Sequence, residues 1–219
     1  MLRMINLVPT NVVLKKYMYQ IHFLTFITLH VGFISIDCGI PEGSKYTDKK
    51  TGITYVSDAG FIESGISGDI LPEYNYGSLD LHFTTLRSFP QNKRNCYTLK
   101  PKQGKGNRYL ITLGYMYGNY DSKGQPPQFD VYLGADFWVT VYFYDSFDNY
   151  YNEIIHLATS DYIHICLVNT GQGNPVISAI ELRLLDINMG EPSSTSLDLY
   201  NRYDFGSDER VIRSEFFIS

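Results

Sequence analysis

The sequence predicts an all-β protein, built as an antiparallel β-sandwich or jelly roll. Three observations lead to this fold class. Short runs of apolar or alternating residues recur at intervals of about ten residues, turn-forming residues separate them, and no long window shows the 3.6-residue apolar period of a helix. Short strands at this spacing, without intervening helices, are typical of sandwiches and jelly rolls.

The strand pattern begins at 33–36, which also reads as the end of an apolar N-terminal stretch. The strands expected after it are 95–99, 109–113, 129–133, 138–142, 153–157, 162–168 and 177–185. Turn residues lie between them, at 104–107, 124–127, 148–149 and 169–175. Gly and Asn supply the positive φ angles of tight connections there, and Pro supplies a fixed φ.

Residues 1–31 are predicted to be a signal-peptide-like or atypical leader. No charged residue occurs from 17 to 36, and Lys15-Lys16 stand immediately before this stretch, which is the order of a secretory signal. Polar residues such as Gln20 are costly in hydrocarbon and disfavour a stable membrane helix. The absence of a small-x-small cleavage site leaves the atypical leader open. A signal predicts a protein that is secreted or lies at the extracellular face of the plasma membrane.

Composition limits the size of the domain and the class of partner. The 219 residues fit one large β domain or two small ones. The formal net charge is -5 and the pI is about 5.5, and no basic cluster is longer than a pair. A nucleic-acid binder needs a basic surface, so the sequence excludes that partner class.

The last residues, 187–219, are predicted to be a linker followed by a tail that either docks on the main domain or remains mobile. Residues 190–196 form a polar linker, and the tail mixes charged and aromatic residues without a clear series of strands. This tail is too short to bury a core by itself. The main domain is therefore expected to span 32–186.

Three cysteines permit one disulfide and leave one thiol. Cys96 and Cys166 each fall in an expected strand and are the preferred bridged pair, with Cys38 reduced. Buried free cysteines that pack as small hydrophobic residues are the alternative. No Asn-x-Ser/Thr sequence occurs in the chain to support secretion through a glycosylation acceptor.

Each candidate motif for catalysis lacks a residue, a spacing or a neighbouring element that the chemistry requires. Residues 65–69 lack the second glycine of a nucleophile elbow, and 171–175 lie between strands with no helix to receive a phosphate. The histidines have no metal-ligand spacing, and Asp145 and Asp148 lack the central glycine of a calcium loop. We expect no catalytic residue, no metal site and no cofactor. A glycosidase with a pair of carboxylates is the minority hypothesis.

A series of short blocks is similar, in chain order, to one family. The blocks include FISIDCG at 33–39, LRSFP at 86–90, YMYGNYD at 115–121, FDVYLG at 129–134 and ISAIELR at 177–183. With them the sequence resembles the malectin-like ectodomain of plant leucine-rich-repeat receptor-like serine/threonine kinases. The resemblance covers about 32–205. It implies one malectin-type β-sandwich, the first of two lobes, followed by the start of a second lobe at 200–206.

The resemblance implies ligand binding, with carbohydrate or cell-wall glycan as the expected partner. The alternative is a protein-interaction module that binds a secreted peptide or a co-receptor, within a receptor or as a soluble decoy. The chain has no kinase glycine-rich loop or catalytic loop. Signalling by phosphoryl transfer is therefore not expected from this chain. A membrane association is expected only in the context of a full-length receptor.

The expected ligand-binding residues gather after the strand at 109–113. Tyrosine faces offer apolar area to sugar C–H groups, and neighbouring Asn and Asp side chains bind hydroxyls. If Met116 packs inward, the alternation of a strand exposes both Tyr115 and Tyr117 at the rim. The alternative is that both tyrosines are buried with their hydroxyls capped at the sheet edge. The expected set is Tyr55, Asp58, Tyr115, Tyr117, Asn119, Tyr120 and Asp121.

Overall fold

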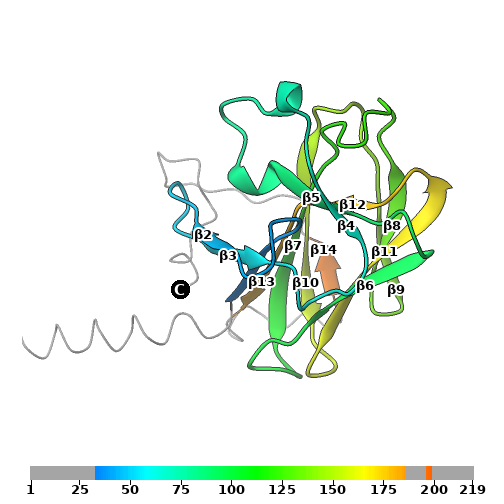
Figure 1. Ribbon diagram of the computed structural model, residues 1–219. Coiled ribbons are helices and arrows are strands. Elements are labelled where there is room, and N and C mark those ends of the chain that lie inside the picture. Colours follow the sequence, from blue (N-terminus) through cyan, green and yellow to red (C-terminus); the bar gives the residue numbers. More distant parts are fainter. Residues whose placement is uncertain (1–32, 186–195, 199–219) are drawn as a thin grey trace, which may run out of the picture. The chain divides into compact units, whose positions relative to one another are not determined.

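The computed structural model describes residues 33–185 and 196–198 of the chain, and these residues form an almost entirely β structure (Figure 1). The strands are β1 (Phe33–Asp37), β2 (Lys45–Thr47), β3 (Thr54–Ser57), β4 (Ile66–Asp69), β5 (Thr85–Ser88), β6 (Arg94–Leu99), β7 (Arg108–Met116), β8 (Gln128–Leu133), β9 (Asp136–Val141), β10 (Asn149–Leu157), β11 (Ile163–Gln172), β12 (Val176–Ile177), β13 (Ala179–Leu184) and β14 (Ser196–Asp198). Two short 3-10 helices, η1 (Pro72–Tyr74) and η2 (Leu81–Phe83), lie between β4 and β5.

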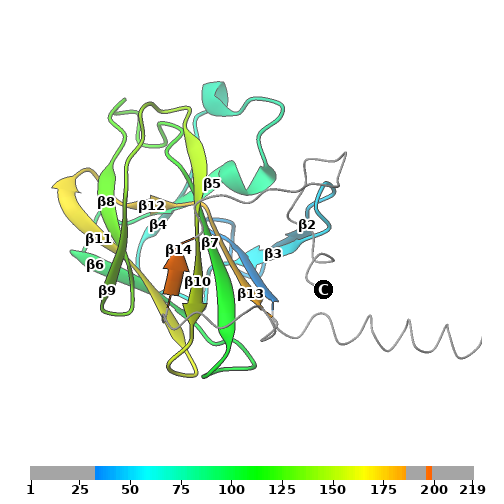
Figure 2. The same ribbon diagram turned by 180° about the vertical axis from the view of Figure 1, so that it is seen from behind.

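The strands form three sheets, which the two opposite views show packed around a common interior (Figures 1 and 2). A seven-stranded sheet has the order β14-β10-β7-β13-β1-β3-β2, a four-stranded sheet has the order β6-β11-β8-β9, and a three-stranded sheet has the order β12-β5-β4. All pairings of these strands are antiparallel except that of β1 with β3, which is parallel. The predicted antiparallel β-sandwich is confirmed.

Strand β7 runs through the centre of the core and is buried on both faces. Every residue from Tyr109 to Met116 is buried. On one face the ring of Tyr115 lies 6.0 Å from that of Phe129 in the four-stranded sheet. On the other face Gly114 lies against Tyr151, whose ring packs 4.9 Å from that of Phe83 in η2. A strand covered on both sides needs apolar residues on both sides, which is why β7 reads as a continuous apolar run.

The long strands were predicted from the apolar pattern of the sequence, whereas the short strands β2 to β5 were not. The seven expected strands from 95–99 onward and the first at 33–36 are all present, although Ser178 divides the last into β12 and β13. Strands β2 to β5 were not predicted from periodicity. They have three or four residues each, and β2 and β4 carry polar or glycine residues instead of an apolar alternation.

The expected leader at 1–31 lies outside the described residues, as does most of 187–219. Within the latter range Ser196–Asp198 forms β14 and pairs with β10, with Leu197 opposite Ile155. Among the residues that the structure describes, no helix is long and apolar enough to cross a membrane.

Candidate functional site

The turn after β7 and the turn between β11 and β12 enclose a pocket of about 320 Å³. Three of the expected binding residues, Tyr117, Tyr120 and Asp121, line this pocket. Its other lining residues are Lys123, Gln125, Pro126, Pro127, Gly171, Gln172, Gly173 and Asn174. The site thus joins two loops that are about fifty residues apart in the sequence.

The turn after β7 depends on residues that tolerate a left-handed backbone. Gly118, Asn119 and Ser122 have φ angles of 48°, 49° and 58°. A Cβ on Gly118 would overlap the side chain of Ile70, and the Gly118 carbonyl accepts a hydrogen bond of 2.9 Å from the Leu71 backbone N–H. Gly and Asn adopt this conformation at low cost, so the local sequence fits the sharp change of direction.

Polar contacts within the turn hold the pocket wall. The Tyr117 hydroxyl lies 2.5 Å from Asp121 Oδ1 and 3.2 Å from Asn119 Oδ1, and can donate to either oxygen. Asn119 Oδ1 also accepts a 2.8 Å bond from the Gly124 backbone N–H. Lys123 Nζ lies 3.2 Å from Asp121 Oδ2. These contacts connect both ends of the turn through side chains.

Two pKa shifts define the protonation of this wall. Burial raises the pKa of Asp121, but hydrogen bonds from Tyr117 and Lys123 and the Lys123 charge outweigh it, so the pKa lies below its ordinary value. Burial and the hydrogen bond to Asp121 raise the pKa of the Tyr117 phenol. The carboxylate is therefore charged and the phenol neutral at neutral and mildly acidic pH.

The lining of the pocket suits a small ligand that carries hydroxyl groups. Gln125, Gln172 and Asn174 offer amides that can both donate and accept, whereas Asp121 accepts and Lys123 donates. The half-buried ring of Tyr120, perpendicular to Tyr117 with 5.7 Å between ring centroids, adds apolar area. Hydroxyl-binding groups beside an aromatic ring are a combination that fits a sugar.

Of the two alternatives for Tyr115 and Tyr117, exposure at the rim is wrong, and burial is what the structure has. Their side chains are 0% and 1% exposed, because the four-stranded sheet covers the face of β7 that carries Tyr115, while Tyr117 lies under its own turn. The alternative of capped hydroxyls describes Tyr117, whose hydroxyl meets Asp121. The hydroxyl of Tyr115 is buried and has no hydrogen-bond partner among the described residues. Tyr115 belongs to the core.

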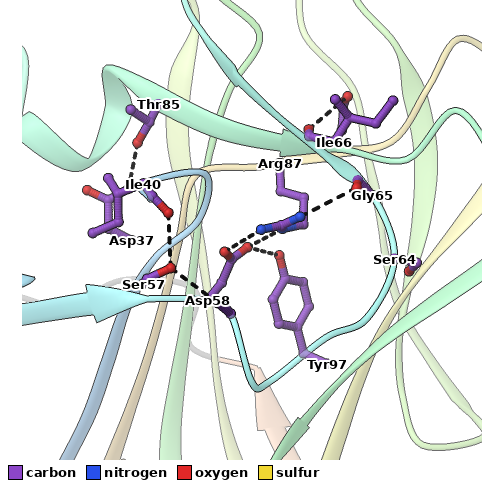
Figure 3. A network of polar contacts seen from close by, with 12 residues as sticks. Asp37, Ile40, Ser57, Asp58, Ser64, Gly65, Ile66, Thr85, Arg87 and Tyr97 are labelled. Atoms are coloured by element: carbon purple, nitrogen blue, oxygen red, sulfur yellow. Dashed lines mark hydrogen bonds and ion pairs between the residues drawn. The ribbon is translucent and has the colours of Figure 1, made fainter. Parts of the chain in front are cut away.

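The second expected stretch, with Tyr55 and Asp58, is also buried and away from the pocket lining. Asp58 accepts hydrogen bonds from Arg87, with Nη2 at 2.7 Å, and from the Tyr97 hydroxyl at 3.0 Å. Figure 3 shows the carboxylate pointing at both partners. Tyr55 donates a 2.7 Å bond to Glu181 Oε1. These contacts tie β3 and the residue that follows it to β5, β6 and β13, so both residues have a structural role.

Sequence reasoning missed the second wall of the pocket. The stretch 171–175 was considered only as a phosphate loop and set aside, yet Gly171, Gln172, Gly173 and Asn174 line the pocket. The sequence predicted a turn at these residues, but only the fold shows that this turn lies opposite the turn after β7. A second and more open hollow of about 700 Å³ lies beside β6 and the segment 60–64. It was not predicted.

The cysteines pair as the sequence analysis preferred. Cys96 and Cys166 are directly opposite each other on β6 and β11 and form a disulfide in the structure, with their Cα atoms 3.9 Å apart. Cys38 is buried and free. Within residues 33–185 and 196–198 no three His, Cys, Asp or Glu side chains form a group that could hold a metal ion.

Comparisons with known proteins agree with this architecture. The family model described as a malectin-like domain matches residues 36–216. Two leucine-rich repeat receptor-like protein kinases of Arabidopsis thaliana are 50% identical over 175 residues and 49% identical over 176 residues, in each case 80% of this chain and 20% of the relative. The chain therefore spans about a fifth of the length of the curated relatives it matches.

Solved structures share the fold at low sequence identity. The ANX1 ectodomain from Arabidopsis thaliana superposes with a TM-score of 0.59 at 17% identity, over 70% of this chain and 42% of that chain. A structure of the plant peptide RALF23 in complex with FER and LLG2 gives a TM-score of 0.55 at 14% identity, over 70% of this chain and 40% of that chain.

Proposed function

The chain belongs to the malectin-like domain family, and from this premise we propose that it is a ligand-recognition domain of a receptor-kinase ectodomain that binds carbohydrate. A cell-wall glycan is the expected ligand, and the pocket between the turn after β7 and the β11–β12 turn is its site. The domain binds and does not catalyse. The extracellular side of the plasma membrane is the proposed location, because the relatives are receptor-like kinases.

The observation that carries this proposal is the composition of the pocket. Its volume of about 320 Å³ and its mixture of amides, one carboxylate and one ammonium match the dense hydroxyl pattern of a sugar. Because the turn after β7 is held by its own hydrogen bonds, the Asp121 carboxylate and the Tyr117 ring are in place before the ligand arrives. Preorganised groups lose little freedom on binding.

A glycan array followed by titration of pocket variants tests the proposal. Tyr120→Ala removes the partly exposed ring, and Gln172→Ala removes an amide from the opposite wall. Each should weaken binding of the glycan identified on the array by roughly 1–2 kcal/mol, the size of one aromatic or hydrogen-bonded contact. Tyr162→Ala is the control, since Tyr162 is exposed and lies outside the pocket lining. Equal affinities for all four proteins would refute the site.

Recognition of a secreted peptide or a co-receptor, in a receptor or as a soluble decoy, is the second candidate function. Two observations favour it. Several aromatic side chains are exposed at loops outside the pocket, and one structural neighbour is described as a peptide in complex with FER and LLG2. A pull-down with secreted peptides, run beside the glycan array on the same protein, separates the two candidates.

A further inference from the structure

Two loops at one end of the domain expose a set of aromatic side chains outside the pocket. The segment around η1 and the connection between β9 and β10 lie at the same end in both views (Figures 1 and 2). We name this set the aromatic loop surface. It consists of the exposed Tyr76, Tyr142, Tyr144 and Phe147, together with the partly buried Tyr74, and none of these residues lines the pocket. Tyr144 is 86% exposed, and Tyr142 and Phe147 are each 51% exposed.

The two loops are in direct contact, so the aromatic loop surface is continuous across them. The ring centroids of Tyr74 and Phe147 are 4.5 Å apart, and Asn149 donates a hydrogen bond to the Tyr76 hydroxyl. On the β9–β10 connection, Tyr142 and Tyr144 form an edge-to-face pair with 5.3 Å between their centroids. An exposed group of tyrosine and phenylalanine rings is the composition that protein interfaces favour.

The β9–β10 connection is held in one shape by its own polar groups. Asp148 Oδ2 accepts backbone N–H bonds from Tyr144 at 2.5 Å and Asp145 at 3.1 Å. Asp145 Oδ1 accepts backbone N–H bonds from Phe147 at 2.7 Å and Asp148 at 3.1 Å. The exposed rings therefore project from an ordered backbone, which lowers the conformational entropy lost when a partner binds.

The loops of the aromatic loop surface carry only acidic charges. Residues 71–80 and 142–149 contain the carboxylates Glu73, Asp80, Asp145 and Asp148 and no Lys or Arg. One cation from elsewhere, Lys50, reaches Asp80 at 3.4 Å. Asp145 and Asp148 direct their hydrogen bonds to the backbone, but their charges stay close to the exposed rings. The electrostatic potential at this surface therefore favours a cationic partner.

We propose that the aromatic loop surface binds a cationic peptide segment, with arginine or lysine side chains placed over the tyrosine rings. A cation over a tyrosine face is attracted by the ring quadrupole, and the neighbouring carboxylates add to that attraction. A second copy of this chain would bring two acidic faces together, and an acidic glycan would be repelled. This site gives the second candidate function a location, and it is separate from the pocket.

Fluorescence anisotropy tests the proposal with defined probes. A labelled peptide of alternating glycine and arginine should bind the intact chain, and its uncharged citrulline counterpart should bind at least tenfold more weakly. Tyr144→Ala should weaken binding of the arginine peptide about fivefold, the scale of one exposed cation–π contact. Tyr144→Phe keeps the ring and should stay within about twofold of the unsubstituted chain. Tyr144 is so exposed that neither substitution disturbs the core.

Two control variants show whether binding depends on this surface alone. Tyr162→Ala removes an exposed tyrosine elsewhere, and Gln172→Ala alters only the pocket; both should leave peptide binding unchanged. The proposal is overturned if Tyr144→Ala leaves the affinity for the arginine peptide unchanged. It is also overturned if Tyr162→Ala lowers that affinity as much as Tyr144→Ala does. A dimer in sedimentation velocity that Tyr144→Ala dissociates overturns it too, because a second copy would then cover the surface. Loss of glycan binding in Gln172→Ala with peptide binding intact would show that the two sites are independent.

Discussion

Asp37 ends strand β1 as a carboxyl group that is 1% exposed. It accepts hydrogen bonds from the Tyr46 hydroxyl at 2.7 Å and the Thr85 hydroxyl at 2.6 Å, and both bonds lower its pKa. Burial outweighs them, and the nearby Asp58 charge acts in the same direction as burial, so the pKa of Asp37 rises to about 7. Burial in the folded protein therefore keeps the Asp37 carboxyl group mainly protonated below about pH 7.

We expect Asp37 to make the domain less stable as pH rises. The folded pKa is about 7 against an ordinary value of 3.8, so between those values the folded protein holds a proton that the unfolded chain releases. The free energy of unfolding therefore falls from about pH 4 to about pH 7 and levels off above. In the unsubstituted chain this fall in the free energy of unfolding should amount to as much as roughly 4 kcal/mol, on the basis of about 1.4 kcal/mol per pKa unit. Asp37→Asn should abolish it.

Urea unfolding at several pH values measures this effect as a difference between variants. Asp69 is an exposed carboxylate, so Asp69→Asn is the matched control and should keep the slope of the unsubstituted chain. Parallel pH profiles for the unsubstituted chain and Asp37→Asn would show that Asp37 does not titrate in this range.

The three cysteines should differ in reactivity according to their bonding and burial. Cys38 is buried, and burial raises the pKa of its thiol, so little reactive thiolate forms. Alkylation with mass mapping should label no cysteine in the native protein, Cys38 alone after unfolding without reductant, and all three after reduction. Three labelled cysteines in the unfolded, unreduced protein would contradict the Cys96–Cys166 disulfide.

Gly118 lies in the turn that connects the core strand β7 to the pocket. Gly118 combines a φ of 48° with direct contact to Ile70. Gly118→Ala should lower the free energy of unfolding by about 2–4 kcal/mol, since it adds both left-handed strain and overpacking. Gly124→Ala is a matched control, because Gly124 also has a positive φ of 64° but nothing lies within 4 Å of a Cβ there. It should cost about 1–2 kcal/mol. Equal losses in a urea titration would mean that the contact with Ile70 is unimportant.

Elements with a strong apolar pattern could be predicted from the sequence, and those defined by their neighbours could not. Strands β6 to β11 follow the pattern closely. Strand β7 illustrates the limit: the alternation rule assigns Tyr115 and Met116 to opposite faces, but it cannot tell that η2 and the four-stranded sheet cover both. Strands such as β4 (Ile66–Asp69) form because β5 offers an edge, which periodicity does not encode.

At the scale of the whole molecule, the sequence was enough to predict the fold class but only part of the candidate site. The turn holding Tyr117, Tyr120 and Asp121 was identified as a place for a ligand, and the structure adds the wall at Gln172 and Asn174. The sequence analysis placed Tyr55 and Asp58 in the site as well. A buried carboxylate needs hydrogen-bond partners, and the Asp58 carboxylate has them in Arg87 and Tyr97, so it is not available to a ligand. Pairings between distant residues depend on topology, which a single sequence does not show.

The start of β1 and the end of β13 lie side by side, since Phe33 lies opposite Arg183. A stretching force applied through those ends would open the β1–β13 ladder one residue pair at a time, from Phe33 toward Asp37, instead of loading all its hydrogen bonds together in shear. Peeling of β1 would end at Asp37 and bring its carboxyl group into water, so mechanical opening and proton release would be coupled.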